Sequence, residues 1–212
     1  MSYLFDEKNV TQPTLVHKMQ SISIGIVIYS EKKKLYNEKN KKMEILSMAE
    51  EMIIRNSTEN DIEEICDIAV QQWSAIYIGY AERLGQELYD LVTKSDPLGR
   101  KRAIIREIAQ DHDHCIVTEI DGKVVAFAHY LIDEVNGNLV GELGNNAVNA
   151  DYKGRGIAGK QYDVIFERMK ALGCVAVKVH TGLDDGHAPA RRAYEKAGFE
   201  KKLPSVIYYK KL

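Results

Sequence analysis

The sequence has few cysteines and no long apolar run. Its three cysteines, Cys66, Cys115 and Cys174, are scattered, and none belongs to a C-x-x-C pair. This usage argues against a disulfide framework and a zinc site, and it indicates reduced thiols in a cytoplasmic chain. No apolar run approaches the roughly 20 residues that a membrane-spanning helix needs. We therefore expect no bound metal and no membrane partner.

The chain also lacks an excess of either charge. Its 29 basic and 31 acidic residues leave a formal net charge of -2. A balance of this kind creates no overall field that would attract nucleic acid, so we expect no nucleic-acid partner. The 212 residues, 45% of them hydrophobic, suit one ordinary domain plus an extension.

Residues 1–50 differ in character from the rest of the chain. A short apolar stretch at 22–29 is followed by lysine-rich segments at 31–34 and 39–42. A signal peptide is one interpretation, but no small-x-small cleavage site follows Tyr29, and the charges after the stretch are basic. We expect a poorly ordered N-terminal extension, or sequence upstream of the true start, ahead of a domain at 52–212.

Helical patterns follow a short strand at Met52–Arg55. The Thr58-x-x-Asp61 motif places a capping residue and a carboxylate in a first helical turn, and apolar residues then recur at three- and four-residue spacing. Residues 74–110 predict two further helical pieces, with a break at 95–99. This part of the chain therefore predicts three helices after the first strand.

Two turn signals predict a run of antiparallel strands. Asp121-Gly122 separates the β-rich segments Cys115–Ile120 and Val124–Ile132. Asn136-Gly137 then precedes a third strand at Leu139–Val148. Asp-Gly and Asn-Gly between β-rich segments are the strongest short-range hairpin signals, so the three strands should pair in sequence order.

The C-terminal part predicts a strand–helix–strand crossover. A helix over Ile157–Leu172 should end at Gly173, and a β-branched strand at 174–179 is expected to be central. A helix over Ala188–Ala197 and a last strand at Val206–Tyr209 complete the order β-α-α-α-β-β-β-α-β-α-β. The fold class is therefore mixed α/β (α+β), with a mainly antiparallel twisted sheet and helices on both faces.

The glycine-rich stretch Lys153–Lys160 matches three phosphate-binding patterns. A nucleoside-triphosphate loop needs a hydroxyl after the lysine, and Gln161 stands there instead. A dinucleotide loop needs its first glycine directly after a strand and an acidic residue about 20 positions later. Here residues 149–153 intervene, and no carboxylate follows the next strand before Asp184. Both nucleotide interpretations are therefore unfavourable.

The third pattern, basic-x-x-G-x-[G/A], binds the pyrophosphate of coenzyme A. It needs backbone N–H groups from a tight turn and from a helix N-terminus, and it needs no metal. Gly154 and Gly156 allow a close approach of the main chain, and Ala158 keeps the first helical turn small. A plain glycine-rich helix start is the alternative interpretation.

Three segments together resemble the GNAT superfamily of acetyl-CoA-dependent N-acetyltransferases. They are Glu142–Val148 as the fourth strand, Lys153–Ala158 as the pyrophosphate loop, and Ala190–Phe199 as the last helix and its exit. The element order from Met52 to Leu212 agrees with that family. The resemblance implies a cytoplasmic enzyme, monomer or homodimer, with acetyl-CoA as its cosubstrate.

The resemblance also implies a set of cofactor contacts. The backbone of the fourth strand would pair with the pantetheine arm as an added strand. The N–H groups of the glycine loop would hold the pyrophosphate. The residues implied are Ala147, Val148, Lys153, Gly154, Arg155, Gly156, Ile157, Ala158, Gly159 and Lys160.

Catalytic roles follow from the last helix. The family often has Asn-x-x-Ala-x-x-x-Tyr, and this chain has His187-x-x-Ala190-x-x-x-Tyr194. The resemblance therefore implies that Tyr194 is the general acid, although a core aromatic is the alternative. His187, in place of the asparagine, would donate one hydrogen bond to the cofactor, take part in acid–base chemistry, or act only as a helix cap.

Other candidates carry an alternative as well. Glu142 is the candidate base, acting through water, or an ordinary solvated strand residue. Asn145 and Asn146 would bind substrate or satisfy backbone groups at a bulge, and Tyr208 would line the acceptor site or only form a strand. The segment 111–114, Asp-His-Asp-His, resembles a metal cluster, but a solvated connector is expected because no further Cys or His set accompanies it.

The sequence therefore predicts an N-acetyltransferase. It would transfer an acetyl group from acetyl-CoA to a primary amine of a small molecule or peptide by direct attack in a ternary complex, since no cysteine lies in the motif region. Residues 74–113 would form the wall of the acceptor site. The alternative is a non-catalytic acyl-CoA-binding sensor of the same fold, which the His187 substitution keeps open.

Overall fold

The computed structural model describes residues 34–39 and 51–212. Residues 34–39 form a short helical segment. Apart from that segment, the extension predicted for residues 1–50 lies outside the described residues. The description below concerns residues 51–212.

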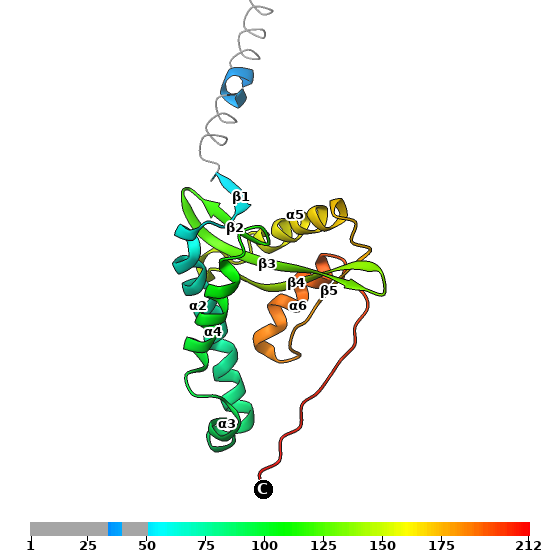
Figure 1. Ribbon diagram of the computed structural model, residues 1–212. Coiled ribbons are helices and arrows are strands. Elements are labelled where there is room, and N and C mark those ends of the chain that lie inside the picture. Colours follow the sequence, from blue (N-terminus) through cyan, green and yellow to red (C-terminus); the bar gives the residue numbers. More distant parts are fainter. Residues whose placement is uncertain (1–33, 40–50) are drawn as a thin grey trace, which may run out of the picture. The chain divides into compact units, whose positions relative to one another are not determined.

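A five-stranded sheet forms the centre of this part of the chain (Figure 1). The strands lie in sequence order, with antiparallel pairing between neighbours except for the parallel pair β4–β5. The mixed, mainly antiparallel sheet expected from the sequence is confirmed. The strands are β1 (Met52–Asn56), β2 (Cys115–Ile120), β3 (Lys123–Val135), β4 (Asn138–Val148) and β5 (Ala176–Val179).

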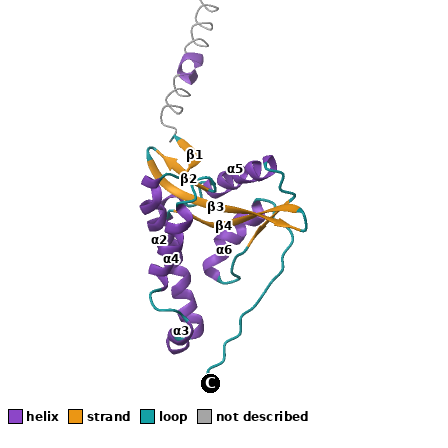
Figure 2. Cartoon of the chain, in the orientation of Figure 1, coloured by secondary structure: helices purple, strands orange, loops and turns teal. Residues whose placement is uncertain are grey.

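Helices cover both faces of the sheet, as Figure 2 shows. The helices α2 and α4 pack on one face, and α5 packs on the other. Among the described residues, no helix combines the length and the apolar character needed to cross a membrane. The helices are α2 (Ile62–Leu84), α3 (Gln86–Val92), α4 (Pro97–Ala109), α5 (Ile157–Ala171) and α6 (Ala188–Lys196), with 3-10 turns η1 (Glu59–Asp61), η2 (Ala150–Tyr152) and η3 (Asp185–His187).

Both predicted hairpin turns are present. Asp121 and Asn136 adopt positive φ angles of 50° and 52°, and the glycine after each has φ of 78°. Positive φ at both central residues is the requirement of a type I′ turn, whose twist matches that of the flanking strands. The two dipeptides thus set the register of β2, β3 and β4.

The helical part differs from the prediction in where it breaks. The expected boundary near residue 74 is wrong, because α2 continues without interruption to Leu84. The break comes at Gly85, which has φ of 76°, a conformation that costs glycine little and other residues more. The apolar spacing alone did not reveal this position.

Two predictions about the C-terminal part are also wrong. The strand expected to be central is β5, which pairs only with β4 in the described part of the chain and lies at the sheet edge. The last strand expected at Val206–Tyr209 does not form, since residues 200–212 are described without helix or strand. Their apolar side chains, such as Ile207 at 77% exposed, find no partner strand.

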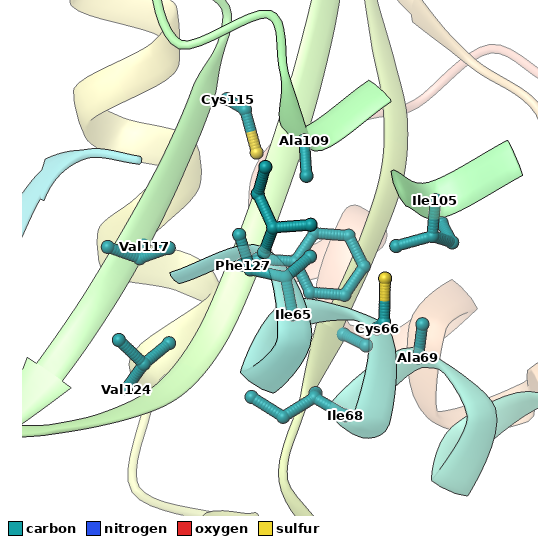
Figure 3. Packing of buried hydrophobic residues seen from close by; sticks show 12 residues of the cluster. Ile65, Cys66, Ile68, Ala69, Ile105, Ala109, Cys115, Val117, Val124 and Phe127 are labelled. Carbon is teal, nitrogen blue, oxygen red and sulfur yellow. The ribbon is translucent and has the colours of Figure 1, made fainter. Parts of the chain in front are cut away.

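One hydrophobic core lies between the sheet and the helices α2 and α4. Figure 3 shows Phe127 of β3 facing Ile65 and Cys66 of α2 and Ile105 of α4, all fully buried. Burial raises the pKa of the Cys66 thiol and raises that of Cys115 to about 11. Both thiols are therefore protonated at neutral pH and act as small apolar groups.

The junction between β1 and α2 is held by a buried carboxylate. Asp61 accepts hydrogen bonds from the backbone N–H and the hydroxyl of Thr58, at 2.7 and 2.8 Å. Its two oxygens also accept from Arg55 of β1, at 2.7 and 2.9 Å. The helix start predicted from the Thr58-x-x-Asp61 motif is confirmed, and the arginine adds a bidentate link to the sheet.

Replacing Asp61 with Asn should destabilise the fold by about 1–3 kcal/mol, because the Arg55 guanidinium loses its buried partner and keeps only Glu119. Urea unfolding at pH 7 measures this. The control is Asp67→Asn, which removes an exposed pair with Arg102 and should change stability little. Equal losses in the two variants would contradict the buried-pair account.

The free energy of unfolding should also decrease at low pH, because Asp61 becomes protonated. Burial acts to raise the pKa of this carboxyl, but the hydrogen bonds from Arg55 and Thr58 lower it below its ordinary value. A lowered pKa stabilises the fold above the unfolded value of about 4, and the gain is lost as the pH falls through the lowered value. The unfolding free energy of Asp61→Asn should therefore decline less than that of the natural chain between pH 5 and pH 2.

Candidate active site

The strands β4 and β5 separate partway along their length. They pair from Val140 opposite Ala176 to Leu143 opposite Val179. Beyond Leu143, β4 continues to Val148, and in the described part of the chain these last residues pair only with β3. One edge of β4 at 144–148 therefore presents backbone N–H and C=O groups to a ligand, as an open strand edge does.

A β-bulge lies at the point where the strands separate. Ala128 of β3 faces Asn146 and Tyr130 faces Leu143, so that His129 stands opposite both Gly144 and Asn145. A bulge redirects side chains and interrupts regular pairing, and it is common beside active sites. The bulge expected around Asn145 and Asn146 is thus present in β4.

Asn146 connects two tyrosines on the α5 side of the sheet. Its Nδ2 donates to the Tyr194 hydroxyl at 3.1 Å, and its Oδ1 accepts from the Tyr162 hydroxyl at 2.8 Å. The two rings lie 5.7 Å apart, and Phe199 packs edge-on against Tyr194. Tyr194 accepts the hydrogen bond from Asn146, so this bond does not use the hydroxyl proton of Tyr194.

Tyr194 combines burial with a polar hydroxyl. The side chain is only 7% exposed. Burial raises the pKa of its phenol, and the hydrogen bonds with Asn146 and Tyr162 offset only part of that rise. The phenol is therefore protonated at neutral pH, which is the state that a proton donor requires.

The glycine loop leads into α5 directly after β4 and η2. Gly154 and Gly156 have φ of 79° and 76°, and Gly156 is the N-cap of α5. The residues 153–156 are exposed, whereas Ile157 is buried and anchors the helix start. Arg155 lies over the Tyr152 ring at 4.8 Å.

This loop has the properties of an anion site. The first N–H groups of a helix have no intrahelical acceptor, and the helix dipole adds positive potential there. Lys153, Arg155, Ala158, Gly159 and Lys160 lie on the same exposed turn and first helical turn. The loop follows the open edge at Ala147 and Val148 along the chain, after η2, and the binding of coenzyme A by these residues stays a prediction.

His187 is oriented by a carboxylate. Its Nδ1 lies 2.7 Å from Asp184 Oδ2, and its backbone N–H donates to Asp184 Oδ1 at 3.2 Å. Burial acts to raise the pKa of Asp184, but these hydrogen bonds and the charge of His187 hold it below its ordinary value. Arg191 braces the same turn by donating to the carbonyl oxygens of Gly182 and Asp184. The Nε2 atom of His187 is thereby left facing away from the carboxylate.

Glu142 lies in the paired part of β4, two residues before the bulge. Its Oε2 atom forms an ion pair with Lys178 of β5 at 2.9 Å, and its side chain is 30% exposed. This pair occupies one oxygen of the carboxylate. The role of Glu142 as a base stays a prediction.

Of the remaining sequence candidates, the segment 111–114 lies near the bulge, where Asp111 Oδ2 is 3.9 Å from Nε2 of His129. Tyr208 is in the extended C-terminal segment and is 90% exposed. In the segment 111–114, Asp111 is 3.0 Å from the His114 ring, and His112 bonds to Ser57. Within the described residues, no group of three or more His, Cys, Asp or Glu side chains is arranged to hold a metal.

The structure adds three residues that sequence reasoning missed, namely Tyr162, Lys101 and Trp73. Tyr162 has the apolar-face spacing of an ordinary core position in α5, so no signal distinguished it. Lys101 of α4 donates to Asn145 Oδ1 at 2.5 Å and lies 4.0 Å from the centre of the Trp73 ring. Burial lowers its pKa to about 8. A charged residue on an amphipathic helix is normally solvated, so its sequence position gave no indication of this environment.

Solved structures of similar fold include known acetyltransferases. The aminoglycoside N-acetyltransferase AAC(6')-Iy in complex with CoA is 21% identical, with a TM-score of 0.54, over 77% of this chain and 97% of its own. The same protein with the bisubstrate analogue CoA-S-monomethyl-acetylneamine is 21% identical, with a TM-score of 0.53, over 76% of this chain and 99% of its own. A transcriptional regulator from Bacillus halodurans C-125 is 19% identical with a TM-score of 0.52, over 75% and 99%.

Comparison with curated proteins found no match. The model of the acetyltransferase (GNAT) family matches residues 62–199, which span α2 through the exit of α6. That range includes the open edge of β4, the glycine loop and Tyr194. By this match and by its fold, the chain belongs to the GNAT family of acetyltransferases.

Proposed function

We propose that the protein transfers an acetyl group from acetyl-CoA to a primary amine of a small molecule or peptide, by direct attack in a ternary complex. The observation that carries this proposal is the open edge of β4, which leads at one end into the glycine loop and at the other to the bulge beside Tyr194. The family supports acyl transfer in general.

Donor binding would use main-chain groups. The pantetheine amides would pair with β4 at Ala147 and Val148, where β5 no longer covers the strand. The pyrophosphate would lie on the N–H groups between Gly154 and Gly159, with positive charge from Lys153, Arg155 and Lys160. No metal is needed in this arrangement, because the helix dipole and the basic side chains supply the positive potential.

The thioester carbon would then lie at the bulge. Attack by the amine places negative charge on the carbonyl oxygen, and a backbone N–H freed by the bulge would stabilise that charge. Breaking the carbon–sulfur bond leaves a thiolate with a pKa of about 8.5, by analogy with cysteine. Tyr194, protonated and held by Asn146, would give this thiolate its proton.

The acceptor would approach along α2, α3 and α4, within the wall formed by residues 74–113. Their mixed charge favours no single class of amine. Aminoglycosides, which the neighbour AAC(6')-Iy acts on by its name, are therefore one class to include in a panel with polyamines and lysine-containing peptides. Release of free thiol from acetyl-CoA reports turnover with any of them.

Replacing Tyr194 with Phe should lower kcat by about 100-fold or more, because thiolate release loses its proton donor. Affinity for acetyl-CoA should stay close to that of the natural protein. The matched control is Tyr162→Phe, which removes the other hydroxyl bonded to Asn146. Tyr162 is only 1% exposed and does not meet a ligand, so its variant should lose less activity than Tyr194→Phe.

Equal activity in Tyr194→Phe and the natural protein would overturn the role of Tyr194. Coenzyme A binding without thiol release for any amine in the panel would instead favour a non-catalytic acyl-CoA-binding sensor. The basis for this second function is the histidine at position 187, where the family often has Asn. Calorimetry with acetyl-CoA, run beside the thiol assay, separates the two results.

Replacing Gly156 with Ala should weaken acetyl-CoA binding by about 10-fold or more. The positive φ at Gly156 becomes strained, and the turn that aims the α5 N–H groups shifts. The control is Gly137→Ala, which places the same strain in the β3–β4 hairpin turn, where φ is 78°. Calorimetry without magnesium should show weaker acetyl-CoA binding in Gly156→Ala and unchanged binding in Gly137→Ala. If the natural protein binds acetyl-CoA with magnesium but not without it, the metal-free site is contradicted.

A further inference from the structure

Lys101 is a lysine without the usual solvated environment. Its Nζ donates to Asn145 Oδ1 at 2.5 Å and lies 4.0 Å from the centre of the Trp73 ring. Among the described residues no carboxylate forms an ion pair with it, whereas its neighbour Arg102 pairs with Glu63 and Asp67. The groups that contact Nζ from α2 and β4, Trp73 and Asn145, are neutral.

This environment lowers the pKa of the Lys101 amine to about 8, through burial. Water is replaced by an aromatic ring and one amide oxygen, and the ammonium loses more hydration than these contacts return. A lysine whose pKa lies near the working pH exists in both protonation states there. Such a group can accept a proton and release it again within one catalytic cycle.

Lys101 is also placed beside the bulge of β4. Asn145, its hydrogen-bond partner, directly precedes Asn146, which binds the Tyr194 hydroxyl. The two asparagines point to opposite faces of the sheet, Asn145 toward α4 and Asn146 toward α5 and α6. The basic amine and the acidic phenol thus flank the same two residues of β4, where the open edge begins.

We propose that Nζ of Lys101 is the base that takes up the proton lost by the acceptor amine. This role rests on the acetyl transfer proposed above. It assigns to Lys101 the general-base function that the sequence had suggested for Glu142 or His187. Glu142 forms an ion pair with Lys178, and Nδ1 of His187 contacts the carboxylate of Asp184. Lys101 has only the Asn145 amide as a polar partner in the described structure.

The protons balance in this scheme. Neutral Lys101 takes one proton from the acceptor ammonium, and the resulting amine attacks the thioester carbon. The carbon–sulfur bond breaks as the carbon–nitrogen bond is retained, and Tyr194 protonates the departing thiolate. The second proton leaves the acceptor nitrogen as the amide forms and restores Tyr194, while Lys101 returns its proton to solvent.

The test compares Lys101→Met, which keeps the apolar stem but carries no base, with Lys101→Arg, which stays charged. The control is Lys170→Met, at an exposed lysine of α5 that pairs with Glu167. Turnover is measured from pH 6 to pH 10 with the best acceptor from the amine panel. Acetyl-CoA affinity is measured by calorimetry for every variant.

We expect kcat/KM of the natural protein to rise through an apparent pKa near 8. In both Lys101 variants, kcat/KM at pH 7.5 should be about 100-fold lower, and the rise of kcat/KM near pH 8 should be absent. Their affinity for acetyl-CoA should be unchanged, and Lys170→Met should behave like the natural protein. The loss should be smaller for a fluorinated primary amine that is already neutral at pH 7.5, because it has no proton to give before attack. A purely structural role would not produce that selectivity.

An unchanged pH profile in Lys101→Met would overturn the role of Lys101 while leaving acetyl transfer intact. So would full turnover by protein in which mass spectrometry finds every Lys101 acetylated, since an acylated amine cannot serve as a base. Failure of the natural protein to bind acetyl-CoA would instead remove the proposed function itself. The calorimetric result distinguishes these two failures.

Discussion

The separation of β4 from β5 is the constraint on which the rest of the site depends. A strand within a sheet satisfies its backbone groups on both edges, and β4 does so only as far as Leu143. Beyond that residue, one edge has groups that need a partner, and an extended ligand with amides can supply it. The glycine loop follows this open part of β4 along the chain, after η2.

The bulge turns that open edge into a site with two chemically different sides. A regular strand would also alternate its side chains, but the extra residue opposite His129 interrupts the pairing at this point. Asn145 then engages a half-buried amine, and Asn146 engages a buried phenol. In both cases burial raises the cost of the charged form, so the pKa of Lys101 falls and that of Tyr194 rises. One physical effect thus acts in opposite directions on the two groups that we propose as base and acid.

Local signals in the sequence predicted most of the elements of residues 51–212. The Asp-Gly and Asn-Gly turns and the Thr58-x-x-Asp61 helix start all depend on contacts within a few residues, and the structure contains them. The break at Gly85 and the unpaired segment 200–212 were not predicted. A strand pattern reports β propensity, but a strand forms only where another edge is available, and that availability is a property of the assembled sheet.

The sequence by itself determined the order of elements from β1 to α6, the glycine loop and the candidate phenol at Tyr194, because each is specified by residue type and short spacing. Tertiary structure alone decided the environments of Lys101 and Asn146. Lys101 and Asn145 are 44 positions apart, and Asn146 and Tyr194 are 48 apart. No local pattern encodes which distant groups will exclude water from an ionisable side chain. Such a group acquires its chemistry only when helices and sheet pack around it.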